Sequence, residues 1–178
     1  MGKYLVGIDE GTTGCKTCIF DFEGNLVGTD YREYPCYYPH PGWVEQKSED
    51  ITPALFASIK SAIEGSGIDP KEIVALGLSS QAGPVGLVDK DGKMIRDWVG
   101  WQDVRAQQPE CDEILSMIPH DEYYAITGDP LGFTLSAARK IWLKHNEPEN
   151  WAKAAKVIDM QEYFLKEFGA DGYYTDLS

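Results

Sequence analysis

The first part of the chain alternates between short apolar runs and polar breaks. Residues 4–8, 15–22 and 26–34 each have the length and side-chain content of a strand. A polar stretch separates the first two runs, and Glu23-Gly24 begins a turn before the third. Because such short connections join neighbours that run in opposite directions, the pattern predicts three consecutive antiparallel strands.

A helical period follows a proline-containing loop over residues 35–42. Ser48 or Thr52 is expected to cap the helix at its N-terminus, and Gly65 and Gly67 to end it. The apolar positions have the spacing of one helix face, namely Leu55, Phe56, Ile59, Ala62 and Ile63. The pattern therefore predicts an amphipathic helix directly after the three strands.

Beyond this helix the pattern returns to strands and then to helices. Residues 73–79 form a near-continuous apolar run, which predicts a strand buried on both faces. Asp91-Gly92 lies between two short apolar runs and indicates a hairpin. Helices dominate from Val104 onward, with a short strand expected at residues 157–160. The order β-β-β-α-β, followed by helices and a late strand, predicts an α/β fold.

The turn after the first strand carries the clearest chemistry. Glycines allow backbone amides to approach an anion, and hydroxyl groups add donors. Asp9 at the strand end is placed to hold Mg²⁺ through water, and Lys16 to meet a phosphate charge. The stretch is not a Walker loop, which needs Lys and Ser/Thr at the start of a helix. An ordinary hairpin turn is the alternative, since Gly and Thr are common in turns.

Bulk composition limits the partners. The chain has 178 residues, of which 43% are hydrophobic and 25% charged, which suits one globular domain over residues 1–178. A formal net charge of −13 argues against nucleic acid and anionic membranes as partners. No apolar run approaches the roughly 20 residues of a membrane span, and no signal peptide is visible. We therefore expect a cytoplasmic protein.

The four cysteines include one C-x-x-C pair, Cys15 and Cys18. Three residues apart in a strand, these side chains point to opposite faces, and no second pair follows. We therefore expect reduced thiols rather than a metal or redox site.

Asp9-Glu10-Gly11-Thr12-Thr13 between two strands resembles the phosphate loop of actin-like ATPases. Later segments narrow the resemblance to the FGGY family of carbohydrate kinases, and they follow in the order of that family. They are residues 38–46, residues 75–81, residues 100–105, Thr127-Gly128 with Phe133, and Tyr174-Thr175-Asp176. The resemblance runs from Ile8 to Ser178, essentially the whole chain.

The resemblance implies an actin-like (ribonuclease H-like) domain, with a mixed sheet, three leading antiparallel strands and flanking helices. Family members have two such domains around a cleft and more than twice this length. We therefore expect residues 1–178 to be most of the N-terminal, sugar-binding domain, with the C-terminal domain absent. The resemblance also implies that the catalytic Asp base lies beyond residue 178, so no catalytic residue is expected in this chain.

The resemblance implies ATP and Mg²⁺ as the nucleotide and metal, with Asp9 holding Mg²⁺ through water. The residues that match the family's loop are Asp9, Gly11, Thr12, Thr13 and Lys16. Many relatives have Ser-Ser-Arg where this chain has Gly14-Cys15-Lys16. The lysine keeps the charge but lacks the two-pronged guanidinium of arginine.

On the sugar side the resemblance implies six residues, because sugars need polar groups for their hydroxyls and an aromatic surface for their C–H side. They are Gln81, Trp101, Asp103, Arg105, Phe133 and Thr134. Core packing of Trp101 and a salt bridge between Arg105 and Asp103 are open alternatives.

The residues after Gln81 depart from the family. Glycerol kinases resemble Gln-Arg-Glu here and xylulose kinases Gln-Met-His, whereas this chain has Ala82-Gly83-Pro84 after the glutamine. The two side chains that grip a polyol are absent, so we expect a substrate more like that of xylulose kinases than glycerol. An open wall at Ala82-Gly83 would admit a bulkier sugar, unless the substrate contacts come from elsewhere.

The sequence thus favours the N-terminal part of an ATP-dependent kinase that phosphorylates a hydroxyl of a sugar or polyol. Alone, this part is expected to be inactive. A non-catalytic actin-like module that binds a nucleotide or a partner is the alternative. A homodimer of the full-length enzyme is left open.

Overall fold

The computed structural model describes residues 3–175, and these divide into two compact units. Unit 1 contains the chain up to Cys36 together with Lys47–Gln81. Unit 2 contains Tyr37–Gln46 and the chain from Ala82 onward. Each unit is described by itself.

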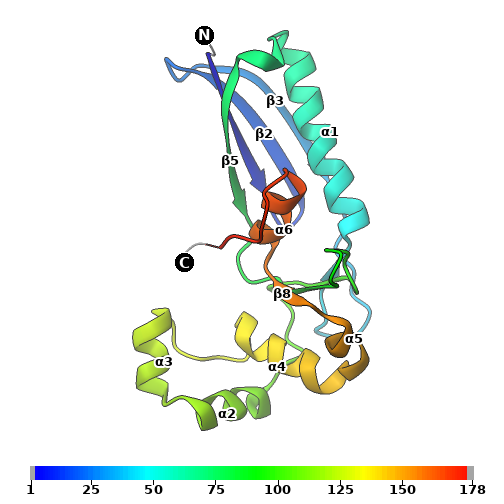
Figure 1. Ribbon diagram of the computed structural model, residues 1–178, viewed down its shortest axis with the longest axis vertical. Coiled ribbons are helices and arrows are strands. Elements are labelled where there is room, and N and C mark those ends of the chain that lie inside the picture. The colour runs from blue at the N-terminus through cyan, green and yellow to red at the C-terminus, as the bar shows by residue number, and fades with distance from the viewer. Residues whose placement is uncertain (1–2, 176–178) are drawn as a thin grey trace. The chain divides into compact units, whose positions relative to one another are not determined.

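Unit 1 is a four-stranded sheet with one long helix. The strands are β1 (Tyr4–Glu10), β2 (Gly14–Asp21), β3 (Leu26–Glu33) and β5 (Ile73–Ser80), in the order β3-β2-β1-β5 (Figure 1). The first three strands are antiparallel, which confirms the prediction, and β5 runs parallel to β1. Helix α1 (Ser48–Ser66) packs against β2 and β3.

The core of unit 1 lies between α1 and the sheet. Ile19 of β2, with Ile51 and Leu55 of α1, is fully buried. Phe56, which the sequence pattern placed on the buried face, is 40% exposed. The helix begins at Ser48, and Lys47 before it has the extended backbone of a capping residue. The prediction of Ser48 or Thr52 as the cap is therefore wrong. Of the two glycines expected to end the helix, Gly67 does so, whereas Gly65 lies within it.

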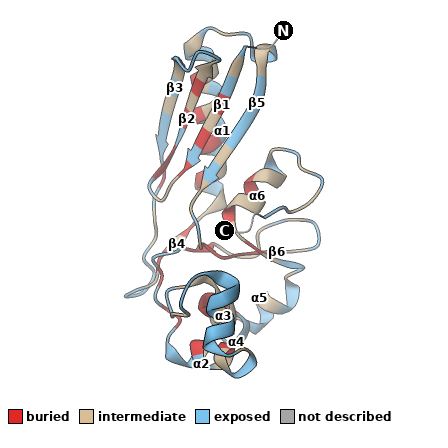
Figure 2. Cartoon of the chain, turned by 90° about the vertical axis from the view of Figure 1, so that its left-hand side faces the viewer, coloured by how far each residue is buried: buried red, intermediate tan, exposed pale blue. Residues whose placement is uncertain are grey.

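Strand β5 is much more exposed than its apolar sequence predicts. Val74 is 52% exposed and Leu76 41%, and Figure 2 shows most of β5 as exposed. The prediction of a strand buried on both faces is wrong for the described residues. The reason is the position of β5 in the sheet. It is an edge strand that pairs with β1 alone in this sheet, whereas α1 packs against β2 and β3.

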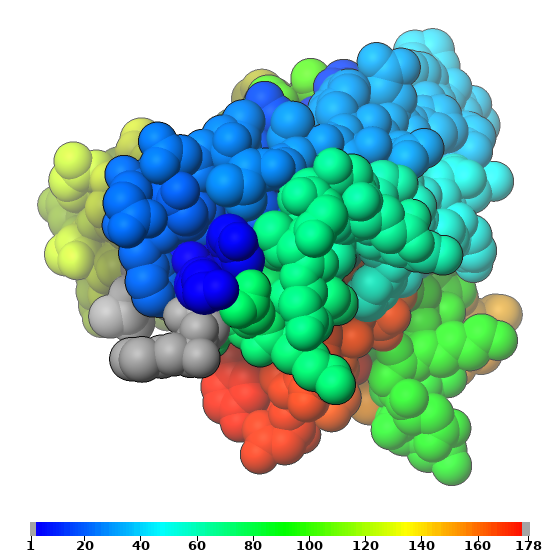
Figure 3. Space-filling model, turned by 90° about the horizontal axis from the view of Figure 1, so that it is seen from above, coloured from blue at the N-terminus to red at the C-terminus, as the bar shows by residue number. Residues whose placement is uncertain are grey.

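The start of the chain contacts the segment that precedes β5. The Lys3 amide donates to the Glu72 carbonyl at 2.7 Å, and the Lys3 ammonium lies 2.8 Å from the Glu72 carboxylate. Glu72 belongs to the short helix η1 (Pro70–Glu72), which leads into β5. Figure 3 shows this segment beside the start of β1.

Unit 2 combines two small antiparallel sheets with five helices among its described residues. Strand β4 (Glu45–Gln46) pairs with β7 (Trp98–Val99), and β6 (Gly86–Val88) with β8 (Lys156–Ile158). The helices are α2 (Gln108–Met117), α3 (His120–Thr127), α4 (Ser136–Asn146), α5 (Pro148–Lys153) and α6 (Met160–Glu167). The late strand predicted at residues 157–160 is confirmed as β8.

The predicted hairpin in unit 2 is present as a tight turn. Val88 bridges Met94, and the Gly92 amide donates to the Asp89 carbonyl at 3.0 Å. Gly92 has φ +80°, a backbone conformation that side chains rarely tolerate.

Helix α4 joins two buried clusters of unit 2. Its Leu143 packs with Val85 and Val99, and its Ala138 packs with Ala106 and Cys111. Trp142 of the same helix packs against both clusters, so α4 is the central support of this unit.

The four cysteines are free thiols, as predicted. Burial raises the pKa of the Cys15 thiol to about 11, so it is protonated at neutral pH. No helix among residues 3–175 is both long enough and apolar enough to cross a membrane.

Candidate functional site

The turn predicted to bind phosphate connects β1 to β2, the two central strands of the unit 1 sheet, at one end of the strands. Glu10 pairs with Cys15, so the intervening residues make a short connection. The Gly11 amide donates to the Gly14 carbonyl at 3.0 Å, which closes this turn. That amide is therefore used within the loop, and any ligand there would bind to other donors.

Two charged side chains of the predicted site stand opposite one another. Asp9 pairs with Lys16 on β2 and with Ser79 on β5. Because directly paired residues of a sheet point to the same face, these three side chains share a face beside the loop. Asp9 and Lys16 are both exposed, so a carboxylate and an ammonium are presented together to solvent.

A hollow of about 470 Å³ extends along the same face of the sheet. The hollow is open at Gly7 and Gly77 because these residues have no side chain, and a β-carbon at either position would meet nothing within 4 Å. The lining residues are Gly7, Ile8, Asp9, Lys16, Cys18, Phe20, Gly77, Leu78 and Ser79. The polar end of the hollow lies at the loop, and the rest is apolar.

The residues beside the loop fit Mg²⁺ only if a nucleotide shares its coordination. Among residues 3–175, no group of three or more His, Cys, Asp or Glu is arranged to hold a metal ion. Mg²⁺ commonly binds proteins through one or two carboxylates together with substrate phosphates and water. A single exposed carboxylate at Asp9 suits that second arrangement.

Gly14, where many relatives have serine, is packed too tightly for a side chain. A β-carbon there would lie 2.5 Å from the Arg32 carbonyl oxygen and 2.6 Å from the Tyr31 hydroxyl. The neighbouring strand β3 thus approaches the loop closely at this residue. The departure from Ser-Ser-Arg is accommodated by the local packing of this chain.

Replacing Gly14 by alanine is expected to lower the free energy of unfolding by about 1–3 kcal/mol, because backbone must move to make room. Gly7→Ala is the matched control on the adjacent strand, where the added methyl group meets open space and the expected change is within about 1 kcal/mol. Urea unfolding of both variants measures the difference. Equal stabilities would show that the close approach at Gly14 does not exist.

A buried carboxylate, Glu10, lies directly under the loop, and the sequence interpretation did not single it out. Its side chain accepts hydrogen bonds from the Gln81 side-chain amide at 2.7 Å and from the Gln81 backbone amide at 3.3 Å. The Tyr34 hydroxyl lies 2.8 Å from the same carboxyl group. Burial raises the pKa of Glu10. Strand alternation would have revealed this burial, since Glu10 has the same parity as Val6 and Ile8.

The six residues predicted on the sugar side divide between the two units. Gln81 follows β5 in unit 1 and contacts Glu10 there. The other five lie in unit 2, where they have three different environments.

Asp103 and Arg105 form a buried ion pair in unit 2. The Arg105 guanidinium donates from Nε and Nη2 to the two carboxylate oxygens of Asp103, each at 2.9 Å. Nη2 also donates to Glu45 at 2.8 Å, and the guanidinium stacks 3.9 Å over the Trp43 ring. The Asp103 carboxylate additionally accepts from the Val44 amide at 2.6 Å. This is the salt-bridge alternative of the sequence analysis: both side chains have no exposed surface, so neither presents a group to a sugar.

Trp101 and Thr134, by contrast, line a cavity of about 740 Å³ within unit 2. Trp101 is 45% exposed, which disagrees with the core-packing alternative. Ala82 and Gly83 also line the cavity, but a β-carbon at Gly83 would lie 3.3 Å from the Arg139 guanidinium and 3.5 Å from the Trp101 β-carbon, so the wall is occupied at Gly83. Phe133 is 41% exposed beside Thr134 but is not part of the lining.

Arg139 of α4, which the sequence interpretation missed, forms hydrogen bonds to several of the segments that line this cavity. Its guanidinium donates to the backbone carbonyls of Gly83 at 2.9 Å and Trp101 at 3.2 Å. It also donates to the carbonyls of Asp103 at 3.3 Å and Thr134 at 2.5 Å. Arg139 is only 1% exposed, and burial lowers its pKa. The sequence around Arg139 does not indicate that this cation binds four carbonyls.

Arg139→Lys is expected to lower the free energy of unfolding by about 1–3 kcal/mol, because one ammonium cannot replace a planar fork that reaches four carbonyls. Thermal unfolding with tryptophan fluorescence measures this change, since Trp101 is in the affected wall. Lys140→Arg, at a partly exposed position of α4, is the control. An equal effect of the two substitutions would contradict the role of Arg139.

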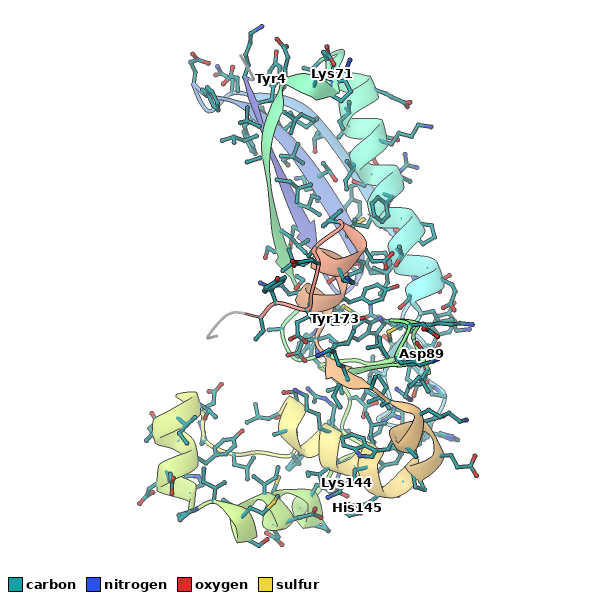
Figure 4. The ribbon with its side chains drawn as sticks, in the orientation of Figure 1. Tyr4, Lys71, Asp89, Lys144, His145 and Tyr173 are labelled. Atoms are coloured by element: carbon teal, nitrogen blue, oxygen red, sulfur yellow. The ribbon has the colours of Figure 1, made fainter. Side chains whose placement is uncertain are left out.

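The histidines of the described chain do not form a catalytic group. The best connected is His145, whose Nε2 lies 2.6 Å from a Glu113 carboxylate oxygen. Lys144 beside it lies 3.5 Å from the same carboxylate (Figure 4). This exposed pair links α4 to α2 on the surface, and no nucleophile adjoins it.

An actin-like ATPase fold is the class that these features define: a mixed sheet with three leading antiparallel strands, a polar β1–β2 turn and flanking helices. Residues 4–178 match the FGGY family of carbohydrate kinases, N-terminal domain, and the chain belongs to that family.

Relatives and solved structures agree on the family. A glycerol kinase of Thermococcus gammatolerans is 36% identical over 156 residues, which cover 88% of this chain and 31% of that protein. A structure described as a xyloylose kinase from Brucella ovis superposes with a TM-score of 0.80 at 29% identity, covering 91% of this chain and 33% of that one. Xylulose kinase from Rhodospirillum rubrum gives 0.83 at 21% identity, over 92% and 33% of the two chains, and shows the fold alone. The chain thus spans about a third of the length of the relatives it matches.

Proposed function

We propose that this chain supplies most of the sugar-binding domain of an ATP-dependent carbohydrate kinase, with both compact units belonging to that one domain. The observation that carries the proposal is the Asp9–Lys16 pair beside the Gly11–Gly14 turn, in a chain of this family. Phosphoryl transfer needs a protein mainly for positioning and for neutralising charge. A paired carboxylate and ammonium beside a glycine turn serve those needs.

In this proposal the loop of unit 1 binds the phosphates of ATP. Lys16 neutralises phosphate charge, and Asp9 holds Mg²⁺ through water. Mg²⁺, when bound, offsets the negative charge that develops on the transferred group. The base that takes the proton from the sugar hydroxyl lies outside residues 1–178.

The sugar contacts that we propose are narrower than the sequence alone suggested. Trp101 and Thr134 line an open cavity and are exposed, whereas Asp103 and Arg105 act as a buried support. Gln81 belongs to unit 1 and is not among the residues that line this cavity, so its contact with the sugar stays a prediction. The aromatic face of Trp101 suits the C–H side of a sugar.

The substrate that we propose is a sugar more like xylulose than glycerol. The relatives include glycerol kinases and the similar structures include xylulose kinases, so the comparisons favour neither. The argument rests on Ala82 and Gly83, which line the cavity and lack the polar side chains that a small triol would need.

A substrate panel tests the proposal on the protein that joins this chain to an ATP-side domain. Release of ADP is measured with glycerol, xylulose, gluconate and a set of pentoses and hexoses. Sugar-dependent release with xylulose above glycerol is expected, and the 178-residue chain alone is expected to give none. Nucleotide binding without sugar-dependent ADP release would favour the alternative, a non-catalytic actin-like module.

A further inference from the structure

We infer that Asp129 and Gln102 set the sugar specificity of this domain: they bind neighbouring hydroxyl groups of a neutral sugar, and Asp129 disfavours sugar acids. This role deepens the proposed function and rests on it, because the cavity of unit 2 lined by Trp101 and Thr134 is taken as the sugar site. The two side chains supply polar contacts that the residues after Gln81 do not.

The cavity has free polar side chains at Gln102 and Asp129. Ala82 and Gly83 line the same cavity and offer no side-chain donor or acceptor. Gln102 and Asp129 are also part of the lining, and both are exposed. Within residues 3–175, neither side chain has a hydrogen bond or an ion pair. Both groups are therefore available to a ligand.

The backbone at Asp129 is held on both sides. Before it, Gly128 ends α3 with φ +75°, and its amide donates to the Tyr124 carbonyl at 2.8 Å. The Asp129 amide donates to the Thr127 hydroxyl at 3.2 Å. After it, Pro130 restricts the conformations open to Asp129. Because the backbone is already fixed, binding a ligand costs this carboxylate little more than its side-chain rotation.

A carboxylate and a primary amide suit the hydroxyl groups of a sugar. An ionised carboxylate only accepts hydrogen bonds, and its two oxygens can accept from two neighbouring hydroxyls. The Gln102 amide both donates and accepts, so it can bind a further hydroxyl. Trp101, next to Gln102 in sequence, is 45% exposed and offers an apolar face to the C–H groups. The cavity thus has the polar and the aromatic contacts that a sugar needs.

Asp129 carries the charge that a ligand in this cavity meets. Arg139 is the other charged residue of the described lining, but it is 1% exposed and its guanidinium donates to four backbone carbonyls. The carboxylate of a sugar acid would therefore face an exposed negative charge, with no accessible cation of the described lining to offset it. The cavity thus favours a neutral sugar over a sugar acid such as gluconate.

Asp129→Asn tests the inference in the protein that joins this chain to an ATP-side domain. The KM for xylulose is expected to rise roughly tenfold to a hundredfold at nearly unchanged kcat, because hydrogen bonds to a charged acceptor are lost. The KM for gluconate is expected to fall roughly threefold to tenfold, because the repulsion between two carboxylates is removed. A merely structural role would not move the two KM values in opposite directions.

Two further variants complete the kinetic test. Gln102→Ala is expected to raise both KM values roughly threefold to tenfold, since it removes hydrogen bonds but no charge. Asp121→Asn is the matched control, because it removes a carboxylate of α3 that is fully exposed and outside the lining. Neither KM is expected to change more than about twofold in this control. Thermal unfolding checks that each variant is folded. Unchanged KM values in Asp129→Asn, or a rise of both by the same factor, would overturn the inference.

A binding measurement separates this inference from the proposed function. The 178-residue chain is titrated with xylulose and with gluconate, and the indole N–H signal of Trp101, assigned with Trp101→Phe, is followed by NMR. Xylulose is expected to shift this signal at lower concentration than gluconate, and Asp129→Asn to reduce that difference. Such shifts without ADP release in the joined protein would refute the proposed function and keep the sugar contact. No shift with xylulose, or equal titrations with the two compounds in the unchanged chain, would overturn the inference.

Discussion

Replacing Asp9 by asparagine is expected to reduce Mg·ATP-dependent sugar phosphorylation by at least about 10²–10³-fold in the protein that joins this chain to an ATP-side domain. The carboxylate is lost while the size of the side chain is kept. Asp9 is exposed and its partner Lys16 is exposed as well, so the fold has little dependence on either charge. The measurement is initial-rate ADP release at saturating sugar, with thermal unfolding of the variant as a check on folding.

Glu23→Gln is the control for Asp9→Asn. It removes the same unit of charge from an exposed site in the turn between β2 and β3. Its rate is expected to match that of the unchanged protein. If both variants keep full activity over a range of Mg²⁺ concentrations, then Asp9 does not hold the metal, and the loop of unit 1 is an ordinary hairpin turn.

The strands and the loop could be predicted because their signals are local. Strand alternation and a short turn depend on residues that are adjacent in sequence. The register of β1 and β2, which sets Asp9 opposite Lys16, is a finding of the structure. The same locality explains the failure at β5. An apolar run predicts burial only when something covers the strand, and Val74 and Leu76 lie on an edge that no described helix of unit 1 covers.

The supporting residues of the site could not be predicted, because their partners are distant in sequence. Glu10 meets Gln81 across 71 positions, and Arg139 reaches the Gly83 carbonyl across 56. Neither residue type is rare. Glu10 lies within the loop segment, but nothing in that segment indicates its partner, and Arg139 stands in no motif. A buried charged residue such as Arg139 needs hydrogen-bond partners, but only the folded chain shows that these partners are backbone carbonyls.

Asp103 and Arg105 show a different limit of sequence interpretation. A segment that matches a family's sugar side can contain residues that hold the segment in place as well as residues that touch the sugar. Trp101 is exposed in this segment, whereas the ion pair two to four residues later is not. The distinction is one of accessibility, which spacing alone does not give.

Arg105→Met is therefore expected to act through stability, lowering the free energy of unfolding by about 3–5 kcal/mol, because it leaves Asp103 buried without its cation. The partner variant Asp103→Asn is expected to cost a similar amount, and the double variant less than the sum of the two.

The control is Arg32→Met, whose ion pair with Asp30 at 2.7 Å is 45% exposed on the arginine side and is expected to contribute less than about 1 kcal/mol. Denaturant titration gives the free energies, and sugar KM is measured in the variants that remain folded. A stable Arg105→Met protein with a greatly raised sugar KM would restore Arg105 as a sugar contact. A large loss of stability with an unchanged KM would establish it as the support that holds Trp101 and its wall, because the Arg105 side chain has no exposed surface for a substrate to touch.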